Sequence, residues 1–246
     1  MHLSALTHLP VIAGAKLLLV AASPLQSLVD KPGITHEFCN KQALSILRDD
    51  GHVPCAEFFE RYITELNAGV YWADTGWKNV SHYFEPTSGK GLWQFPSAAD
   101  EFERYAGKAA LSVQNGNYPQ AVFFLGAATH LVQDVCVPHH ARGKLFCGHQ
   151  EYENWVQQHH TNYAVAVQGI YNEGLKGGMW LLNNAVVAAD LLDWVTADNR
   201  EAFYHKATTI LLPRAQRSTA GLFQQFFATM ACERHRVGRL GGVTVA

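Results

Sequence analysis

The sequence has no excess of either charge. Its 246 residues include 19 Lys and Arg against 21 Asp and Glu, which gives a formal net charge of −2. Binding along a phosphate backbone needs a stripe of basic side chains, and we find none, so no nucleic-acid partner is expected. No apolar run reaches the roughly 18 to 20 residues of a membrane-spanning helix. The hydrophobic content of 48% nevertheless suffices for a sizeable core and excludes wholesale disorder.

A Cys-x-x-Cys pair is also missing among the five cysteines, which are Cys39, Cys55, Cys136, Cys147 and Cys232. Its absence argues against a zinc knuckle built on thiolates, and the odd number excludes a complete disulfide framework. Two interpretations stay open for Cys136 and Cys147, which bracket a short loop. They form either a single bridge or two ordinary buried thiols.

The hydrophobic pattern predicts helices, without the alternation typical of strands and without internal repeats. Residues 69–97 lack sustained periodicity and are rich in Gly, Pro and aromatic residues, which predicts a long loop of the kind that carries function. Apolar positions recur at helical spacing in seven segments: His36–Leu47, Val53–Leu66, Ser97–Gln114, Tyr118–Asp134, Gln150–Gly169, 177–195 and 197–230. We therefore expect an all-α fold, a single-domain multi-helix bundle over residues 23–246.

Residues 1–22 have two interpretations. An apolar stretch ends in Val20-Ala21-Ala22, with small residues at the positions that a signal peptidase recognises. This pattern predicts a signal peptide and a secreted or periplasmic protein. Lys16 interrupts the stretch, and no Lys or Arg precedes it, which favours an ordinary N-terminal helix. Cleavage after Ala22 would make Ser23 the first residue of the mature chain.

Histidine is abundant, with 13 copies, and several stand at metal-binding spacings. His130 and Asp134 are four residues apart on a predicted helix, so both side chains leave one otherwise apolar face. A carboxylate that points into an apolar interior is costly unless it is paired or binds a cation. His149 and Glu153 repeat this spacing, and His140 lies between the two pairs.

The segment upstream adds three further candidates. Asp74 and His82 lie in the predicted loop, and His36 opens the first predicted helix. A single His/Asp pair is more often a surface hydrogen bond, but two such pairs with a histidine between them rarely arise by chance. Imidazole nitrogen and carboxylate oxygen without thiolate suit zinc well, and iron or manganese less well. The sequence therefore predicts a metal centre, with zinc as the favoured ion.

Five motifs together resemble a known family. The most specific segment is 117–134, in which an aromatic-Leu-Gly run precedes His-x-x-x-Asp. The other four are short and surround the remaining candidates: Thr35-His36, Ser81-His82-Tyr83-Phe84-Glu85-Pro86, Val137-Pro138-His139-His140 and Gly148-His149-Gln150-Glu151-Tyr152-Glu153. These motifs resemble the zinc-dependent bacterial phospholipases C over about residues 27–230, with Gln133 at a position where glycine is common in that family.

The resemblance implies an all-helical fold with three zinc ions in one cleft. The first ion would be held by four side chains: Asp74, His82, His130 and Asp134. The second would share Asp134 and add His36 with the amine and carbonyl of the mature N-terminus. The third would have three protein ligands, which are His140, His149 and Glu153. Three ligands leave one position for substrate or water, as in catalytic zinc sites.

The resemblance also implies the reaction, which is hydrolysis of the glycerol-side phosphodiester of a phospholipid to diacylglycerol and a phosphorylated head group. Transient contact with a membrane surface would accompany it, and no obligate protein partner is predicted. Asp74 is the candidate catalytic residue, as zinc ligand, as the group that orients water, or as general base. Two alternatives stay open: a single-strand nuclease or 3′-nucleotidase of the same three-zinc plan, and a non-catalytic zinc-binding homologue. The absence of a tryptophan before His36 favours the latter.

Overall fold

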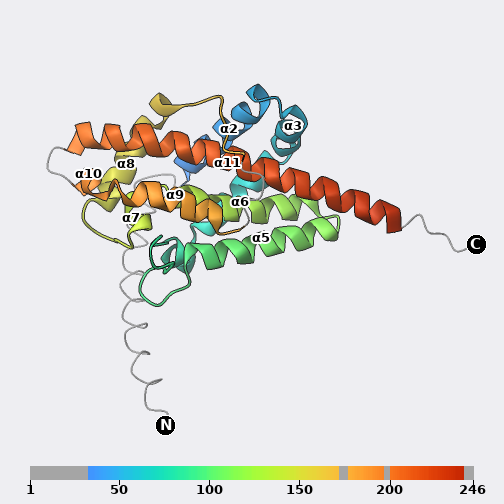
Figure 1. Ribbon diagram of the computed structural model, residues 1–246, viewed down its shortest axis with the longest axis horizontal. Helices are drawn as coiled ribbons and strands as arrows, with labels where there is room; N and C mark the ends of the chain where they lie inside the picture. The colour runs from blue at the N-terminus through green and yellow to red at the C-terminus, as the bar shows by residue number, and fades with distance from the viewer. Residues whose placement is uncertain (1–32, 172–176, 197–199, 241–246) are drawn as a thin grey trace, which may run out of the picture.

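The computed structural model describes residues 33–171, 177–196 and 200–240, and helices dominate throughout these ranges (Figure 1). The elements in chain order are α2 (Ile34–Asp49), α3 (Val53–Arg61), α4 (Ile63–Ala73), the 3₁₀ helix η1 (Gly76–Ser81), α5 (Ala98–Gln114), α6 (Tyr118–Asp134), α7 (Pro138–Ala141), α8 (His149–His159), the 3₁₀ helix η2 (His160–Tyr163), α9 (Met179–Ala189), α10 (Leu192–Thr196) and α11 (Arg200–Leu240). In place of strands the described residues contain one isolated bridge, between Glu85 and Lys90. The expected all-α fold is confirmed.

Several predicted helices differ from the observed ones in length. The segment predicted as one helix over Val53–Leu66 is two, because the backbone at Tyr62 leaves the helical region (φ −114°, ψ 23°) before α4 begins. The predicted 177–195 helix is likewise divided into α9 and α10. The helix predicted over Gln150–Gly169 ends at His159, and α11 runs on past residue 230, so these boundaries were wrong.

The predicted loop of residues 69–97 was wrong at its start, because α4 continues through Gly69 to Ala73. A Cβ atom on Gly69 would lie 1.9 Å from the carbonyl oxygen of Phe123, and one on Gly126 would lie 2.0 Å from the carbonyl oxygen of Leu66. Both glycines therefore allow the backbones of α4 and α6 to touch, and Gly69 does not end the helix. Within the same segment, η1 forms a further short helical piece.

The helix α6 lies in the interior of the bundle. Asn117 caps its first turn by accepting a hydrogen bond from the backbone N–H of Gln120, and Pro119 follows in the first turn. Twelve of its 17 residues are buried, among them every residue from Leu125 to Asp134. A helix buried all round normally carries apolar residues alone. The polar side chains at its C-terminal end therefore need partners inside the protein.

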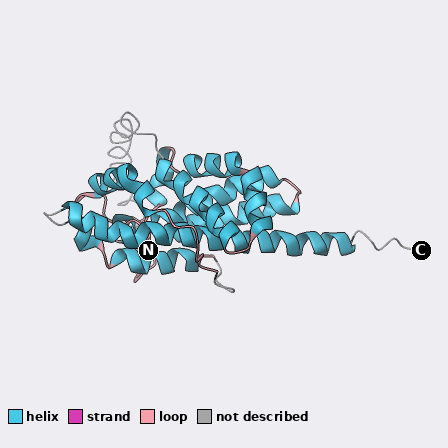
Figure 2. Cartoon of the chain, turned by 90° about the horizontal axis from the view of Figure 1, so that it is seen from above, coloured by secondary structure: helices cyan, strands magenta, loops and turns pink. Residues whose placement is uncertain are grey.

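The longest helix, α11, runs along the whole bundle, and its last turns project beyond it (Figure 2). In the part of the chain that the structure describes, no helix combines the length and the apolarity needed to cross a membrane. Cys136 and Cys147 are separate thiols, the first buried and the second exposed. Residues 1–22, the candidate signal peptide, and Ser23 lie outside the described residues.

Candidate metal centre

The structure brings all eight predicted metal ligands together. In each of three groups the donor atoms lie within 4.8 Å of one another. The groups are His36, His130 and Asp134; Asp74, His82 and His130; and His140, His149 and Glu153. The ligands come from distant parts of the chain: α2, the ends of α4 and η1, the last turns of α6, α7, and the first turn of α8.

Asp134 is the centre of the first two groups and is only 5% exposed. Its Oδ1 lies 3.2 Å from Nε2 of His36, and its Oδ2 lies 2.8 Å from Nδ1 of His82 and 3.1 Å from Nε2 of His130. The two ring nitrogens of His82 and His130 that face each other are 3.2 Å apart. A tetrahedral zinc ion, with bonds of about 2.0–2.1 Å, holds its ligand atoms about 3.3 Å apart. The observed separations are close to that value.

Three of the imidazoles are oriented by their outward nitrogens. His82 donates from Nε2 to the carbonyl oxygen of Ala73 at 3.2 Å, and His140 donates from Nδ1 to the carbonyl oxygen of His82 at 3.3 Å. The Nδ1 atom of His36 lies 2.8 Å from Oε1 of Gln133 and donates to it. Because the outward nitrogen carries the hydrogen, the inward nitrogen of each neutral ring presents a lone pair.

A lone pair that faces a carboxylate oxygen at 2.8–3.2 Å is a repulsive contact unless a cation lies between the two atoms. In the absence of a metal, a proton takes that place. Burial acts to lower the pKa of His36, but the hydrogen bond and negative charge of Asp134 raise it to about 9. The same two factors raise the pKa of His82 despite its burial. The donor set thus fits a dication such as zinc.

The carboxylates of Asp134 and Glu153 stay ionised. Burial acts to raise the pKa of Asp134, yet the neighbouring His130 and His140 hold it well below its usual range. The pKa of Glu153 is also lowered, by the charges and hydrogen bonds of His149 and His140, which outweigh burial. His130 differs from His36 and His82, because burial lowers its pKa and favours the neutral form, in which histidine binds metal.

The third group is compact and partly open to solvent. Oε1 of Glu153 lies 3.1 Å from Nε2 of His140 and 2.9 Å from Nε2 of His149. The Tyr83 ring stacks on His140, with ring centroids 4.7 Å apart. The neighbouring His139 donates from Nε2 to the carbonyl oxygen of Cys147 and is not part of the group. Of the adjacent residues His139 and His140, it is therefore His140, the predicted ligand, that lies beside Glu153.

The two carboxylates that border the centre are more exposed than the one inside it. The side chain of Asp74 is 33% exposed and that of Glu153 is 36% exposed, against 7% for Asp134. Oδ1 of Asp74 lies 4.0 Å from Nε2 of His130. Nδ1 of His140 lies 3.7 Å from Oδ2 of Asp134, which connects the third group to the other two. A solvent molecule or substrate would thus reach the centre beside Asp74 and Glu153.

Sequence reasoning missed the polar residues that surround His36. Gln133, Asn40 and Thr219 are buried and hydrogen-bonded to one another. One local signal existed, because Asn40 lies one helical turn after His36 and Gln133 directly precedes Asp134. Nothing in the sequence indicates that these residues of α2, α6 and α11 meet.

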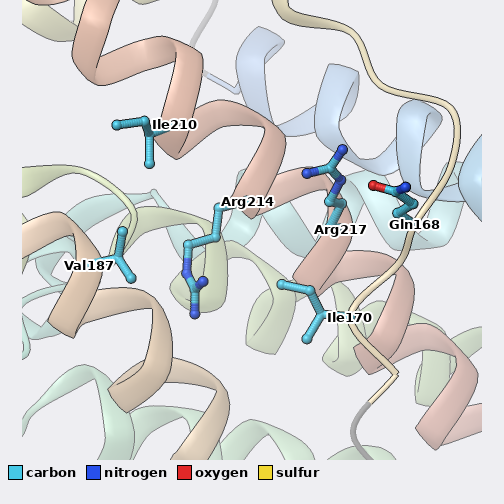
Figure 3. Close-up of a pocket in the computed structure, with 6 residues that line it drawn as sticks. All are labelled: Gln168, Ile170, Val187, Ile210, Arg214 and Arg217. Atoms are coloured by element: carbon cyan, nitrogen blue, oxygen red, sulfur yellow. The ribbon is translucent and has the colours of Figure 1, made fainter.

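The cavity in Figure 3 lies elsewhere and has a volume of about 280 Å³. It is lined by Gln168, Ile170, Val187, Ile210, Arg214 and Arg217, none of which is a predicted ligand. The guanidinium groups of Arg214 and Arg217 point in opposite directions, and Arg214 donates to the carbonyl oxygen of Asn183 at 2.7 Å. The two arginines therefore do not converge on one anion.

One protein-family model matches most of the chain. The family model described as zinc dependent phospholipase C matches residues 35–209, which include all eight candidate ligands. The chain belongs to the zinc-dependent phospholipase C family. A phospholipase C of Paraclostridium bifermentans is 24% identical over 190 residues, which cover 64% of this chain and 48% of the relative. A phospholipase C of Clostridium perfringens (strain 13 / Type A) is 24% identical over 160 residues, which cover 55% and 40%. The chain thus spans about half or less of the length of these relatives.

Solved structures share the fold of this family member. The alpha toxin of Clostridium absonum superposes with a TM-score of 0.71 at 18% identity, covering 80% of this chain and 64% of the toxin chain. The alpha-toxin of an avian strain of Clostridium perfringens gives a TM-score of 0.67 at 19% identity, with 80% and 63% covered. At this identity the likeness demonstrates a common helical fold.

Proposed function

We propose that this family member is a zinc-dependent phospholipase C that hydrolyses the glycerol-side phosphodiester of a phospholipid to diacylglycerol and a phosphorylated head group. One observation carries the proposal: imidazole nitrogens and carboxylate oxygens lie 2.8–3.2 Å apart, and the rings of His36, His82 and His140 present their lone pairs inward. In the same proposal, residues 1–22 are a signal peptide, the protein is secreted or periplasmic, and it contacts a membrane surface transiently.

Three zinc ions are proposed, with the ligands that the family resemblance implies. The first would be held by Asp74, His82, His130 and Asp134, and the third by His140, His149 and Glu153, three residues whose donor atoms lie within 4.8 Å of one another. The second would use His36 and Asp134 with the amine and carbonyl of Ser23, a part of the proposal that rests on the sequence alone. Bound zinc supplies Lewis acidity, which polarises phosphoryl oxygens, offsets their developing charge and lowers the pKa of water to about 7.

The two aspartates would have different roles. Asp134 is buried among imidazoles and its pKa lies well below its usual range, so it is a poor proton acceptor and serves to position His36 and His82. Asp74 is partly exposed and lies at the border of the centre. Its carboxylate is therefore the better candidate to orient the attacking water and to accept its proton.

The test counts zinc first and compares substrates second. Protein purified from a secreting host is expected to contain about three zinc ions per chain by elemental analysis and to release the head group from phospholipid vesicles. Release of mononucleotides from single-stranded DNA without head-group release would favour the nuclease alternative. Full zinc content without hydrolysis of either substrate would indicate a non-catalytic homologue. A chain without zinc would overturn the proposal.

A further inference from the structure

We propose that Gln133 is a positioning residue that fixes which nitrogen of His36 binds zinc. The inference rests on the proposed function only in so far as it takes zinc to be the ion bound. It concerns the second zinc position, to which the proposed function assigns the side chains of His36 and Asp134, whose Nε2 and Oδ1 atoms lie 3.2 Å apart. Gln133 lies next to Asp134 on α6, is 4% exposed, and contacts His36 from the side opposite the metal centre.

The hydrogen bonds of Gln133 determine the orientation of its amide. Its Nε2 donates to Oδ1 of Asn40 and to Oγ1 of Thr219, both at 3.0 Å. Asn40 in turn donates from Nδ2 to Oδ1 of Asn67 at 2.9 Å, which leaves Oδ1 of Asn40 as the acceptor. Both hydrogens of the Gln133 amide are thus engaged, and Oε1 faces Nδ1 of His36 at 2.8 Å.

An amide oxygen only accepts hydrogen bonds, so Nδ1 of His36 carries the hydrogen. The other ring nitrogen, Nε2, lies 3.2 Å from Oδ1 of Asp134 and is left to exchange a proton for a metal ion. With the reverse amide orientation, the NH₂ group would face Nδ1 and hold the hydrogen on Nε2, where it blocks the metal. The chain of amides therefore selects the ring form that can bind zinc.

His36 is the ring whose orientation a side chain controls. The corresponding acceptors for His82 and His140 are the carbonyl oxygens of Ala73 and of His82, which no substitution removes. The acceptor for His36 is Oε1 of Gln133, so a change of one residue withdraws it. Loss of a partner that orients a metal ligand typically weakens metal binding by about 10- to 100-fold.

The first test is a zinc titration against a competing chelator, with folding monitored by circular dichroism. Gln133→Met removes the acceptor at similar side-chain length, and Gln133→Glu keeps an acceptor oxygen. We expect Gln133→Met to bind one of three zinc ions about 10- to 100-fold more weakly. Gln133→Glu should weaken that ion less, because it keeps the acceptor for His36 and loses only the NH₂ donor to Asn40 and Thr219. The matched control is Gln216→Met, because Gln216 is equally buried but hydrogen-bonds to the backbone of Val165 and Tyr163. It should bind all three ions as the wild type does.

A second measurement reports the ring itself. In the zinc-loaded wild type, imidazole ¹H–¹⁵N spectra should show His36 with a slowly exchanging Nδ1–H and with zinc on Nε2. Faster exchange of that proton is expected in Gln133→Met. If Gln133→Met fails to fold, Gln133→Asn can replace it. This variant moves the acceptor away from His36 by one methylene and is expected to weaken the binding of the same ion.

The outcomes separate this inference from the proposed function. Wild-type zinc affinity at every position in Gln133→Met or Gln133→Asn would overturn the role of Gln133, as would zinc bound to Nδ1 of His36. Neither result would affect phospholipid hydrolysis by the wild type. Conversely, loss of one zinc ion in these variants would support the role of Gln133 even if no variant hydrolysed phospholipid. A wild-type chain without zinc would overturn both.

Discussion

A single buried carboxylate, that of Asp134, contacts three histidines. Nε2 of His36, Nδ1 of His82 and Nε2 of His130 all lie within 3.2 Å of its two oxygens. The i,i+4 pair of His130 and Asp134 was predictable, because helical spacing alone puts both side chains on one face. The approach of His36 and His82 was not predictable from spacing, since neither is close to Asp134 in sequence, and only the resemblance to a family indicated it. Neither helical spacing nor the family resemblance indicated the contact between Gln133 and His36.

The first prediction concerns Asp134→Asn. The neutral amide turns one oxygen into an NH₂ group and removes the charge that two zinc positions share, so we expect about one zinc ion per chain in place of about three. Head-group release should fall below detection while the helical circular dichroism is retained. Asp193→Asn, on the exposed surface of α10, is the control and should keep all three ions. Three ions in Asp134→Asn would refute a shared ligand.

The second prediction concerns protons released on zinc binding. In the metal-free protein, Asp134 raises the pKa of His36 to about 9 against the effect of burial, and the pKa values of His82 and His140 are also raised. With a pKa of about 9, the His36 ring is protonated at pH 7 and loses its proton only as the pH increases. Zinc must displace these protons, so its affinity should rise from pH 6 to about 9.

Calorimetric titrations with zinc in buffers of different ionisation enthalpy measure this release. At pH 7 we expect at least one proton per chain to be released, and fewer near pH 9. A zinc affinity independent of pH would contradict the proposed protonation of the centre. His140 in the third group can be compared with His36, because its outward nitrogen donates to a backbone carbonyl and not to a side chain.

At the scale of helices, packing between helices determines boundaries that the helix propensity of the residues leaves undetermined. The sequence places Gly69 in a predicted loop because glycine weakens a helix. In the structure the same glycine continues α4, because only a residue without a side chain lets α4 lie against the backbone of α6. The helix α4 ends at Ala73, and its C-cap residue Asp74 borders the metal centre. No Gly or Pro marks the break at Tyr62 or the division between α9 and α10. Hydrophobic periodicity therefore predicted one helix in each place where the structure has two.

The third prediction tests the contact between α4 and α6. In Gly126→Ala the new Cβ atom would lie 2.0 Å from the carbonyl oxygen of Leu66, a backbone atom that moves only with its helix. Overpacking of this kind costs about 1–3 kcal/mol, so the free energy of unfolding in urea should fall by that amount or more. The matched control is Gly107→Ala on α5, where a Cβ atom meets nothing within 4 Å. It should leave stability unchanged or raise it by up to about 1 kcal/mol. Equal stabilities of the two variants would refute the close approach.

On the scale of the whole molecule, the metal centre joins elements that are distant in sequence. Ligands come from α2, the ends of α4 and η1, α6, α7 and α8, so metal bound there crosslinks half of the fold. Four polar side chains of this centre, those of His82, His130, Asp134 and His140, are buried and replace apolar packing in the interior. A metal-free chain must keep imidazolium and carboxylate groups inside the bundle, where burial of charge is costly. The centre should therefore contribute to stability as well as to chemistry.

The fourth prediction is that zinc stabilises the whole chain. A ligand that binds only the folded state at about 1,000 times its Kd contributes about 4.1 kcal/mol per site. In domains of about 150–250 residues, each kcal/mol shifts the Tm by about 2–4 °C. Removal of zinc with a chelator should therefore lower the Tm by roughly 10 °C or more. Restoring zinc should reverse the change, whereas Mg²⁺ should not, because nitrogen-rich sites suit zinc and Mg²⁺ prefers oxygen. Unchanged melting after complete removal of zinc would contradict the prediction, because an ion that binds only the folded chain must stabilise it.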